Sequence, residues 1–278
     1  MTQEISPRNH TYLKPSTLWS LRQGFPKSWG RIISICSIVI PLIAWTIASY
    51  TKVVSELFLP SPLVVLQTGI KMLLEENLWS DIMISCGRVI GGFLVGGVIG
   101  VPMGLAMGTF HSMENLFAPI VGLVRYMPVP ALMPLIIIWF NIGEVSKIVV
   151  IMLGVVLYNA MMIADAVKFI PNDMINVAYT LGGTRRDVVT RVILPATLPS
   201  VLDTLRVNIA NAWTFLVIAE LIGTDKGLGA VIIRSQRFLH PDKVLFCIGL
   251  MGVIGLGIDY GLRWISTKVT PWADQTRH

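Results

Sequence analysis

The chain has 278 residues, of which 54% are hydrophobic and only 14% are charged. A soluble domain carries about 25% charged residues, so this composition excludes an ordinary soluble protein and predicts an integral membrane protein. The formal charge of +6 does not indicate nucleic-acid binding, because no patch of basic and aromatic residues accompanies it. Basic residues on a membrane protein instead set its orientation in the bilayer.

Six apolar runs reach the length of about 20 residues that a membrane-spanning helix needs. We therefore predict an all-α polytopic membrane protein with about six transmembrane helices. The first run begins only at Ile32 and is itself as long as a membrane helix, so it is expected to stay in the mature chain rather than act as a cleaved signal peptide. The runs cover residues 32–50, 84–108, 117–140, 147–167, 198–221 and 244–265.

The distribution of Lys and Arg predicts the orientation, because basic loops are retained in the cytoplasm. Basic residues precede the first span, which places the N-terminal tail, residues 1–31, in the cytoplasm. An even number of spans returns the C-terminal tail, residues 266–278, to the same side, with the membrane domain over residues 32–265 between them. The basic segment at residues 168–191 is then cytoplasmic as well. The basic residues ahead of the first span are Arg8, Lys14, Arg22, Lys27 and Arg31.

Glycine recurs at every fourth position of the second span, at Gly92, Gly96, Gly100, Gly104 and Gly108. This spacing places all five on one face of a helix and leaves a stripe without side chains. Another helix can approach such a stripe backbone to backbone. The stripe is expected to be either a site of internal packing or a seam along which helices slide during transport.

Three prolines interrupt the third span, at Pro128, Pro130 and Pro134. Each proline lacks an amide donor and blocks the preceding turn, so this helix is expected to be kinked or broken. Irregular backbone at membrane depth is tolerated where protein or a water-filled cavity supplies hydrogen-bond partners. The prolines therefore indicate a translocation path, or else a kinked helix beside one.

Three arginines lie in or near the predicted spans, where a cation costs about 2.5 to 3.5 kcal/mol at the helix centre. Arg88 and Arg206 are expected to extend their side chains to the membrane interface. Arg125, which directly precedes the prolines, is expected either to contact a passing anion or to pair with Glu144 or Asp165.

Two connections outside the spans have patterns of their own. Apolar residues at helical spacing over residues 64–74 predict an interfacial helix on the outer face. The last outer loop, residues 223–243, contains Gly227 and Gly229. It is expected to be a lid, a landing surface for an extracytoplasmic partner, or a plain connection.

A polar, basic segment at residues 171–195 separates the fourth and fifth spans and is expected to dock onto a soluble partner. Residues 171–173 can start a short helix, and Gly182 can end it by adopting backbone angles that other residues resist. Thr184 and Asp187 then resemble a capping box, with Asp in place of the usual Glu, and open a second helix. That helix is expected to end just before the final Leu-Pro, so the segment is predicted to be two short helices joined by a sharp glycine turn.

The segment resembles the signature loop of bacterial ABC importer permeases, which reads Glu-Ala-Ala, three residues, Gly, nine residues, Ile, one residue, Leu-Pro. The glycine, the final alanine and the Leu-Pro match in register, whereas Asn176 stands in place of the acidic residue and Val177 in place of the small one. The residues that the resemblance assigns to coupling with an ATPase are Asn176, Ala178, Gly182, Arg185, Arg186, Leu194 and Pro195.

The resemblance covers most of the chain and is sharpest to the nitrate, sulfonate, taurine and bicarbonate permease group. Residues 213–237 look closer to the taurine and sulfonate branch. The motifs that carry it are Leu59-Pro60-Ser61-Pro62, residues 125–135 with Trp139-Phe140-Asn141-Ile142-Gly143-Glu144, Leu194-Pro195-Ala196-Thr197-Leu198-Pro199, and Ala219-Glu220 with Gly227-Leu228-Gly229.

This resemblance implies a homodimeric channel in the bacterial cytoplasmic (inner) membrane, surrounded by lipid. It also implies two cytoplasmic ATPase subunits and an extracytoplasmic solute-binding protein as partners, and a small anion as cargo. The sequence has no Gly-x-x-x-x-Gly-Lys-Ser/Thr phosphate loop, so ATP and Mg²⁺ are expected on the partner subunits. We expect no cofactor, no metal and no catalytic residue on this chain.

Two other classes of protein were weighed against this one. An ion-coupled secondary transporter would show inverted repeats and acidic relays within the membrane, and neither is evident in the sequence. A membrane-embedded enzyme would need clustered His, Asp or Glu residues, whereas the four histidines are scattered. The three cysteines lie in apolar runs without the spacing of a disulfide or metal site.

Overall fold

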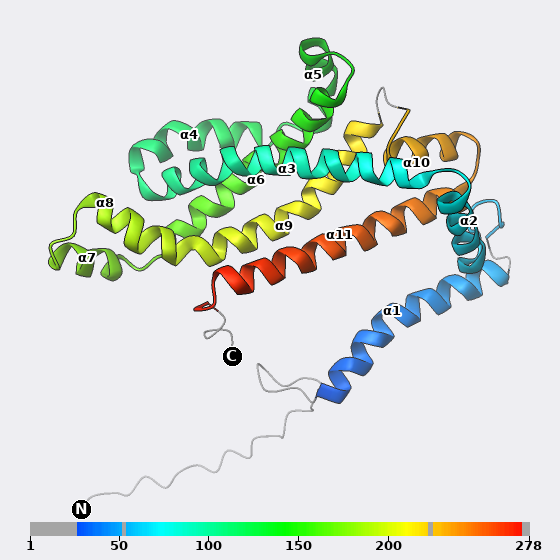
Figure 1. Ribbon diagram of the computed structural model, residues 1–278, viewed down its shortest axis with the longest axis horizontal. Coiled ribbons are helices and arrows are strands. Elements are labelled where there is room, and N and C mark those ends of the chain that lie inside the picture. Colours follow the sequence, from blue (N-terminus) through cyan, green and yellow to red (C-terminus); the bar gives the residue numbers. More distant parts are fainter. Residues whose placement is uncertain (1–26, 52–53, 222–224, 274–278) are drawn as a thin grey trace, which may run out of the picture. The chain divides into compact units, whose positions relative to one another are not determined.

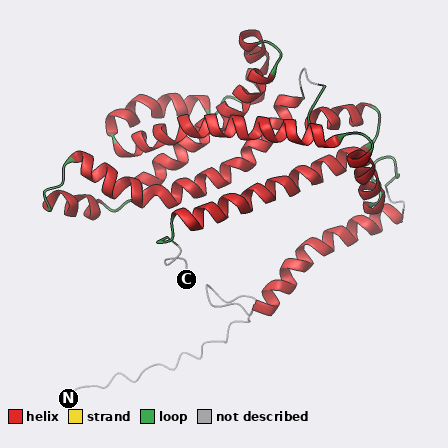
Figure 2. Ribbon diagram, in the orientation of Figure 1, coloured by secondary structure: helices red, strands yellow, loops and turns green. Residues whose placement is uncertain are grey.

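The computed structural model describes residues 27–51, 54–221 and 225–273, and the chain divides into two compact units, residues 1–62 and 63–278. Every regular element in these ranges is a helix (Figure 2). The prediction of an all-α protein is therefore confirmed.

Helix α1 (Lys27–Tyr50) belongs to the first unit and contains the first predicted span. Two hydrogen bonds tie the chain that follows it back to its last turns. The Trp45 Nε1–H donates to the Pro60 carbonyl oxygen at 3.1 Å, and the Ser49 hydroxyl donates to the Leu59 carbonyl oxygen at 3.1 Å. Most of the apolar side chains of α1 are exposed, as expected for a helix that faces lipid.

The second unit contains the remaining helices, of which α3, α6, α9 and α11 run alongside one another (Figure 1). Residues 64–74, predicted as a helix, lie within α2. In chain order the elements are α2 (Pro62–Leu74), α3 (Leu78–Thr109), α4 (His111–Val124), η2 (Val129–Leu132), α5 (Met133–Phe140), α6 (Glu144–Lys168), α7 (Asn172–Thr180), α8 (Arg185–Asp187), η3 (Val188–Ile193), α9 (Leu194–Glu220), α10 (Leu228–Arg237) and α11 (Pro241–Val269).

Five helices in the described ranges are long and apolar enough to cross a membrane, namely α1, α3, α6, the continuous run from α8 to α9, and α11. A sixth span results if α4 and the η2–α5 segment are counted together, although they meet at an angle of 86°. These spans agree with the predicted number. The third span begins earlier than predicted, at His111, and is broken rather than merely kinked.

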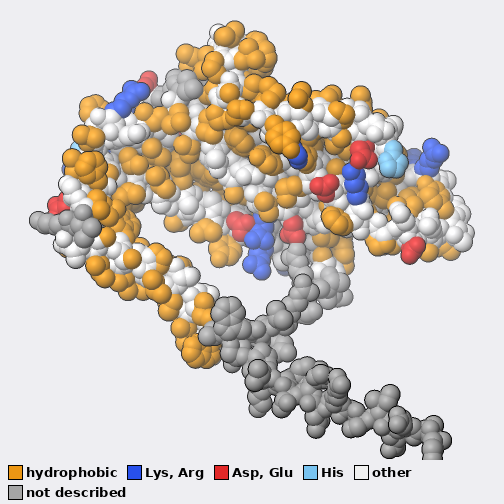
Figure 3. All heavy atoms as spheres, turned by 180° about the vertical axis from the view of Figure 1, so that it is seen from behind, with side chains coloured by type: hydrophobic (Ala, Val, Ile, Leu, Met, Phe, Trp, Pro, Cys, Tyr) orange, Lys and Arg blue, Asp and Glu red, His pale blue; other side chains and the backbone are white. Residues whose placement is uncertain are grey.

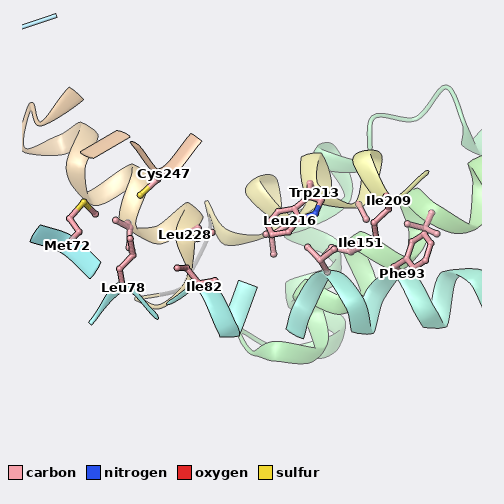
Figure 4. Close-up of a cluster of buried hydrophobic side chains, with 14 residues drawn as sticks. Met72, Leu78, Ile82, Phe93, Ile151, Ile209, Trp213, Leu216, Leu228 and Cys247 are labelled. Carbon is pink, nitrogen blue, oxygen red and sulfur yellow. The ribbon is translucent and has the colours of Figure 1, made fainter. Parts of the chain in front are cut away.

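Buried apolar side chains from α2, α3, α6, α9, α10 and α11 form the largest core of the second unit. Phe93 of α3 and Ile151 of α6 lie beside Ile209 and Trp213 of α9, and Leu228 of α10 belongs to the same cluster (Figure 4). Many large apolar side chains are exposed, and on the face shown in Figure 3 the charged side chains lie in small groups on a largely apolar surface. A protein with an apolar core and an apolar exterior suits a bilayer as solvent.

The five-glycine stripe of α3 lies directly against α6. A Cβ added at Gly100 would lie 2.9 Å from the Val156 carbonyl oxygen, and one at Gly104 would lie 2.7 Å from the Ala160 carbonyl oxygen. The added atoms would meet backbone, which cannot rotate away as a side chain can. The two helices therefore pack backbone to backbone, and this contact is the most extensive between any two helices of the unit.

Replacing Gly104 with alanine is expected to destabilise the protein by about 1 to 3 kcal/mol, because the methyl group overpacks a contact with backbone. The matched control is Gly87→Ala, also in α3, where an added Cβ meets nothing within 4 Å. That control should be neutral or stabilising by up to about 1 kcal/mol, the gain in helix propensity from Gly to Ala. Thermal unfolding in detergent measures both, and equal stability of the two variants would contradict the close packing.

Candidate functional site

The predicted glycine turn in the segment at residues 171–195 is present and is fixed by two backbone hydrogen bonds. The Gly182 N–H donates to the Tyr179 carbonyl oxygen at 2.9 Å, and the Gly183 N–H donates to the Ala178 carbonyl oxygen at 2.9 Å. This pair of bonds is a Schellman motif, which requires a left-handed residue after the helix. Gly182 supplies it with φ of 82°.

The second helix of the segment begins with the predicted capping box. The Asp187 N–H donates to the Thr184 hydroxyl at 3.3 Å, and the Thr184 N–H donates to the Asp187 carboxylate at 3.0 Å. Both bonds satisfy backbone amides that a helix start leaves without partners.

The expectation that this second helix ends before Pro195 is wrong. Helices α8, η3 and α9 form one uninterrupted run of 36 residues, from Arg185 to Glu220. Element η3 is a π-helix, so its turns are wider just before Pro195, whose missing amide and bulky ring would disrupt an α-helical turn. The segment is therefore joined rigidly to a membrane span.

One face of the segment is anchored and the other is exposed. Val188 and Ile193 are buried against Val167 at the end of α6, with Ala178 packed alongside. On the outer side Leu181 is 82% exposed although it is apolar. Ala178 of the predicted coupling set is half-buried, and its other members are exposed, namely Asn176, Gly182, Arg185, Arg186, Leu194 and Pro195.

A groove of about 590 Å³ runs along the segment, and one of its lining residues lies far from the segment in the sequence. Trp272, which follows α11, lines the groove together with Val177 and Leu181 of the first turns and Pro195 of α9. Sequence reasoning placed Trp272 in a plain C-terminal tail. The available signal was an aromatic side chain directly after Pro271, where a helix has just ended.

The proline-rich break between α4 and α5 opens onto a cavity of about 480 Å³. Arg125, Pro128 and Pro130 line it, together with residues 154–165 of α6 and Phe215 of α9, whereas Pro134 does not. The proline cluster thus borders a partly open cavity between helices, which suits either a translocation path or a position beside one.

Arg125 contacts aromatic and sulfur groups in this cavity. Its guanidinium lies 4.7 Å from the Tyr126 ring centroid, and its Nη2 donates to the Tyr126 hydroxyl at 2.7 Å. Among the described residues it forms no ion pair with either acid that the sequence offered. Glu144 binds Arg88 instead, and Asp165 lines the same cavity as Arg125.

Arg88 does not reach the membrane interface as expected. It is 3% exposed and sits in a buried charge cluster that sequence reasoning missed. Its Nε and Nη2 donate to the two oxygens of Glu144 at 2.6 Å each, and its Nη1 donates to Glu220 at 2.6 Å. Helices α3, α6 and α9 are held together at this point.

The glycines of the last predicted outer loop serve the same cluster. The Gly229 N–H donates to the Glu220 carboxylate at 2.7 Å, and the Leu228 N–H donates to the Ser85 hydroxyl at 2.9 Å. Gly227 has φ of 111°, and a Cβ there would collide with Glu220. Residues 222–224 lie outside the described residues. The rest of the predicted loop is mostly helix α10, so Gly227 and Gly229 lie at the start of a helix and not in a plain loop.

Arg206 is also paired inside the protein rather than extended to the interface. Its Nε donates to Asp259 of α11 at 2.6 Å, and both side chains are about one-third exposed. The two residues join α9 to α11 near the middle of both helices. A paired cation avoids most of the cost of an isolated charge in the bilayer.

Comparison with known proteins identifies relatives over most of the chain. Residues 96–271 match the family described as "Binding-protein-dependent transport system inner membrane component". The taurine transport system permease protein TauC of Escherichia coli (strain K12) is 34% identical, over 91% of this chain and 94% of that protein. The putative aliphatic sulfonates transport permease protein SsuC of Bacillus subtilis (strain 168) is 30% identical over 88% of both. The nitrate import permease protein NrtB of Synechococcus elongatus is 26% identical over 71% of this chain and 72% of that protein.

Solved structures of transporters share the fold. An inward-facing structure of the MetNI methionine ABC transporter aligns with a TM-score of 0.58 at 19% identity, covering 69% of this chain and 98% of the other. A crystal structure of an amino acid ABC transporter with histidines aligns with a TM-score of 0.61 at 15% identity, covering 72% and 97%.

Replacing Arg88 with methionine should destabilise the protein by about 3 to 5 kcal/mol, because it leaves the buried Glu220 without a cation. The double variant Arg88→Met with Glu220→Gln should recover part of this loss, since no buried charge then lacks a partner. Lys71→Met is the control, because Lys71 pairs with Glu75 at the exposed surface and should change stability by no more than about 0.5 kcal/mol. If thermal unfolding in detergent finds Arg88→Met no weaker than Lys71→Met, the cluster does not hold the helices together.

Proposed function

Since the chain belongs to the family of binding-protein-dependent transport system inner membrane components, it is a multi-pass permease subunit of an ABC importer, and we propose that it passes a small anion of the nitrate, taurine, alkanesulfonate or bicarbonate type. The names of the relatives support this cargo class, because they include taurine, aliphatic sulfonate and nitrate permeases. The membrane is the inner membrane of the cell. The chain conducts and couples, and bond chemistry belongs to its partners.

The observation that carries the coupling role is the segment at residues 171–195. It presents an exposed apolar and basic surface, its turn is fixed by the Schellman motif at Gly182, and its second helix continues into a membrane span. We assign this surface to an ATPase subunit that binds ATP and Mg²⁺. A rigid helix then transmits the movement of that subunit into the membrane.

The assembly is completed by partners that the family implies. We propose two ATPase subunits on the cytoplasmic side and a solute-binding protein on the other. Both termini and the segment at residues 171–195, here called the coupling segment, would then face the cytoplasm; the basic residues ahead of the first apolar run support this orientation. A second copy of the permease would complete the channel, with lipid around it.

The cavity lined by Arg125 is the proposed place of anion passage. Arg125 offers a permanent cation, and Tyr126 holds it in position by stacking and by a hydrogen bond. The cavity lies along α6, between the charge cluster at one end of that helix and the coupling segment at the other.

Substitution of Gly182 by arginine should leave the protein inserted but uncouple it from the ATPase. Arginine resists the left-handed backbone of the turn, so the two helices of the segment lose their arrangement. Gln236→Arg, which adds the same charge at an exposed position of α10, is the control. Substrate-dependent ATP hydrolysis in proteoliposomes measures coupling, and full activity of Gly182→Arg would exclude the docking role.

The cargo is tested with the permease reconstituted with its ATPase and binding protein, by scanning nitrate, bicarbonate, taurine and alkanesulfonates for stimulated ATP hydrolysis and uptake. One of these anions should stimulate the wild type.

Arg125→Ala should slow uptake of that anion about tenfold while assembly is intact, because one charge-assisted contact is lost. Arg125→Lys should retain part of the rate, and Arg263→Ala, at an exposed position of α11, should retain all of it. Unchanged flux in Arg125→Ala would remove Arg125 from the path, and stimulation by none of the anions would refute the cargo class.

A further inference from the structure

An open groove of about 710 Å³ lies at the end of α6 that is opposite the coupling segment. Helix α3, the start of α6 and residues 225–226 form its walls. The charged residues that line it are Arg88, Glu144, Lys147, Asp225 and Lys226.

Two cations are buried at the floor of this groove, and an exposed carboxylate covers them. The side chains of Arg88 and Lys147 are 3% and 6% exposed, whereas that of Glu144 is 59% exposed. One Glu144 oxygen accepts from Arg88 Nη2 at 2.6 Å and from Lys147 Nζ at 3.2 Å, and the other accepts from Arg88 Nε at 2.6 Å. Arg88 and Lys147 thus hold both oxygens of a carboxylate, which is itself an oxyanion.

The charges of Arg88, Lys147 and the two carboxylates that contact them explain why the floor of the groove needs an anion. Glu220 is buried and already neutralises one of the two cations through its bond to Arg88. The second cation, Lys147, pairs with Glu144, the one carboxylate within ion-pair distance of it among the described residues. Without the Glu144 carboxylate, a buried site with a net charge of one positive unit would face the groove, and such a site has a high cost unless an anion enters it.

We propose that Arg88 and Lys147 form an oxyanion-binding site for the transported substrate, and that Glu144 occupies this site until the substrate displaces it. A nitrate, bicarbonate or sulfonate group presents two oxygens to the guanidinium fork of Arg88 in the manner of a carboxylate, and an oxygen to Lys147. Glu144 can leave without disturbing the core, because its side chain is largely exposed and flexible. The Arg88 bond to Glu220 stays in place and keeps the guanidinium oriented.

The position of the site fits a first station on the proposed route. Lys147 lies on α6 seven residues before Gly154, which is about 10 Å along a helix, and Gly154 begins the part of α6 that lines the Arg125 cavity. The Arg88–Lys147 pair and the cavity that contains Arg125 therefore border successive parts of the same helix, α6. This inference rests on the proposed function, because it takes the transported anion as the ligand.

A purely structural ion-pair cluster is the rival explanation, and competition separates the two. If Glu144 competes with an external anion, then Glu144→Gln should strengthen anion binding. If the cluster only holds helices together, then Glu144→Gln should weaken the protein and leave its response to anions as it was.

The experiment follows thermal unfolding of the full chain, purified in detergent without its partners, as sodium nitrate or sodium methanesulfonate is added. Equal additions of sodium chloride give the effect of ionic strength. The oxyanions should stabilise the wild type, and the midpoint of this titration is the anion concentration that gives half of the full stabilisation. Glu144→Gln should lower the midpoint about tenfold, because it frees one charge-assisted contact for the anion. Lys147→Gln should raise the midpoint about tenfold, because it removes one such contact. Lys147→Arg, which keeps the charge, should restore a midpoint near that of the wild type.

Glu75→Gln and Lys71→Gln are matched controls, because these residues form an exposed Lys–Glu ion pair at the end of α2 and should respond to anions like the wild type. If Glu144→Gln does not unfold cooperatively, Glu144→Asp replaces it, since the shorter carboxylate holds the site less well. Any of three results would overturn the proposal. The Glu144 and Glu75 variants could have equal midpoints, Lys147→Gln could have the wild-type midpoint, or only Glu144→Gln could respond to the anions. The assay contains no ATPase, so a negative result would reject this anion site only. The coupling role is tested separately by the Gly182→Arg experiment.

Discussion

The packing of α3 on α6 is the constraint on which the rest of the second unit depends. Because the stripe from Gly92 to Gly108 has no side chains, the backbones approach until a single added methyl group would meet carbonyl oxygens. Lipid provides no hydrophobic force between helices, so this close contact is a main source of their association. Helix α6 then carries the Arg88 cluster at its start, the Arg125 cavity along its middle and the anchor of the coupling segment at its end.

The cluster around Arg88 shows how a membrane protein retains a buried cation. A lone guanidinium at this depth would cost several kcal/mol, and two carboxylates with short hydrogen bonds offset that cost. Glu220 in turn accepts from Gly229 at one oxygen and from Ser85 at the other, so both oxygens are hydrogen-bonded. This complete set of partners distinguishes it from the free acidic relays of ion-coupled transporters, and it attaches the chain at residues 227–229 to the helices beneath it.

Local signals in the sequence were sufficient for part of this architecture. Run length predicted the spans, and the turn at Gly182 with the capping box at Thr184 was predicted because both depend on residues close in sequence. Contacts between distant residues were not predictable. Arg88 lies 56 residues before Glu144 and 132 before Glu220, so only the packed helices reveal that these three belong together. The coupling and path roles of the named residues stay predictions.

Helix continuity through Pro195 gives the segment and the cluster a mechanical connection. Sequence rules favour a helix end near a proline, but the π-helix before Pro195 removes the conflict, and the run continues to Glu220. At 1.5 Å per residue, this run is on the order of 50 Å long. One end carries the exposed coupling turns, and the other carries the carboxylate that holds Arg88. A tilt of this helix moves both ends together, so a displacement at the coupling segment changes the geometry around Arg88 without an intervening loop to absorb it.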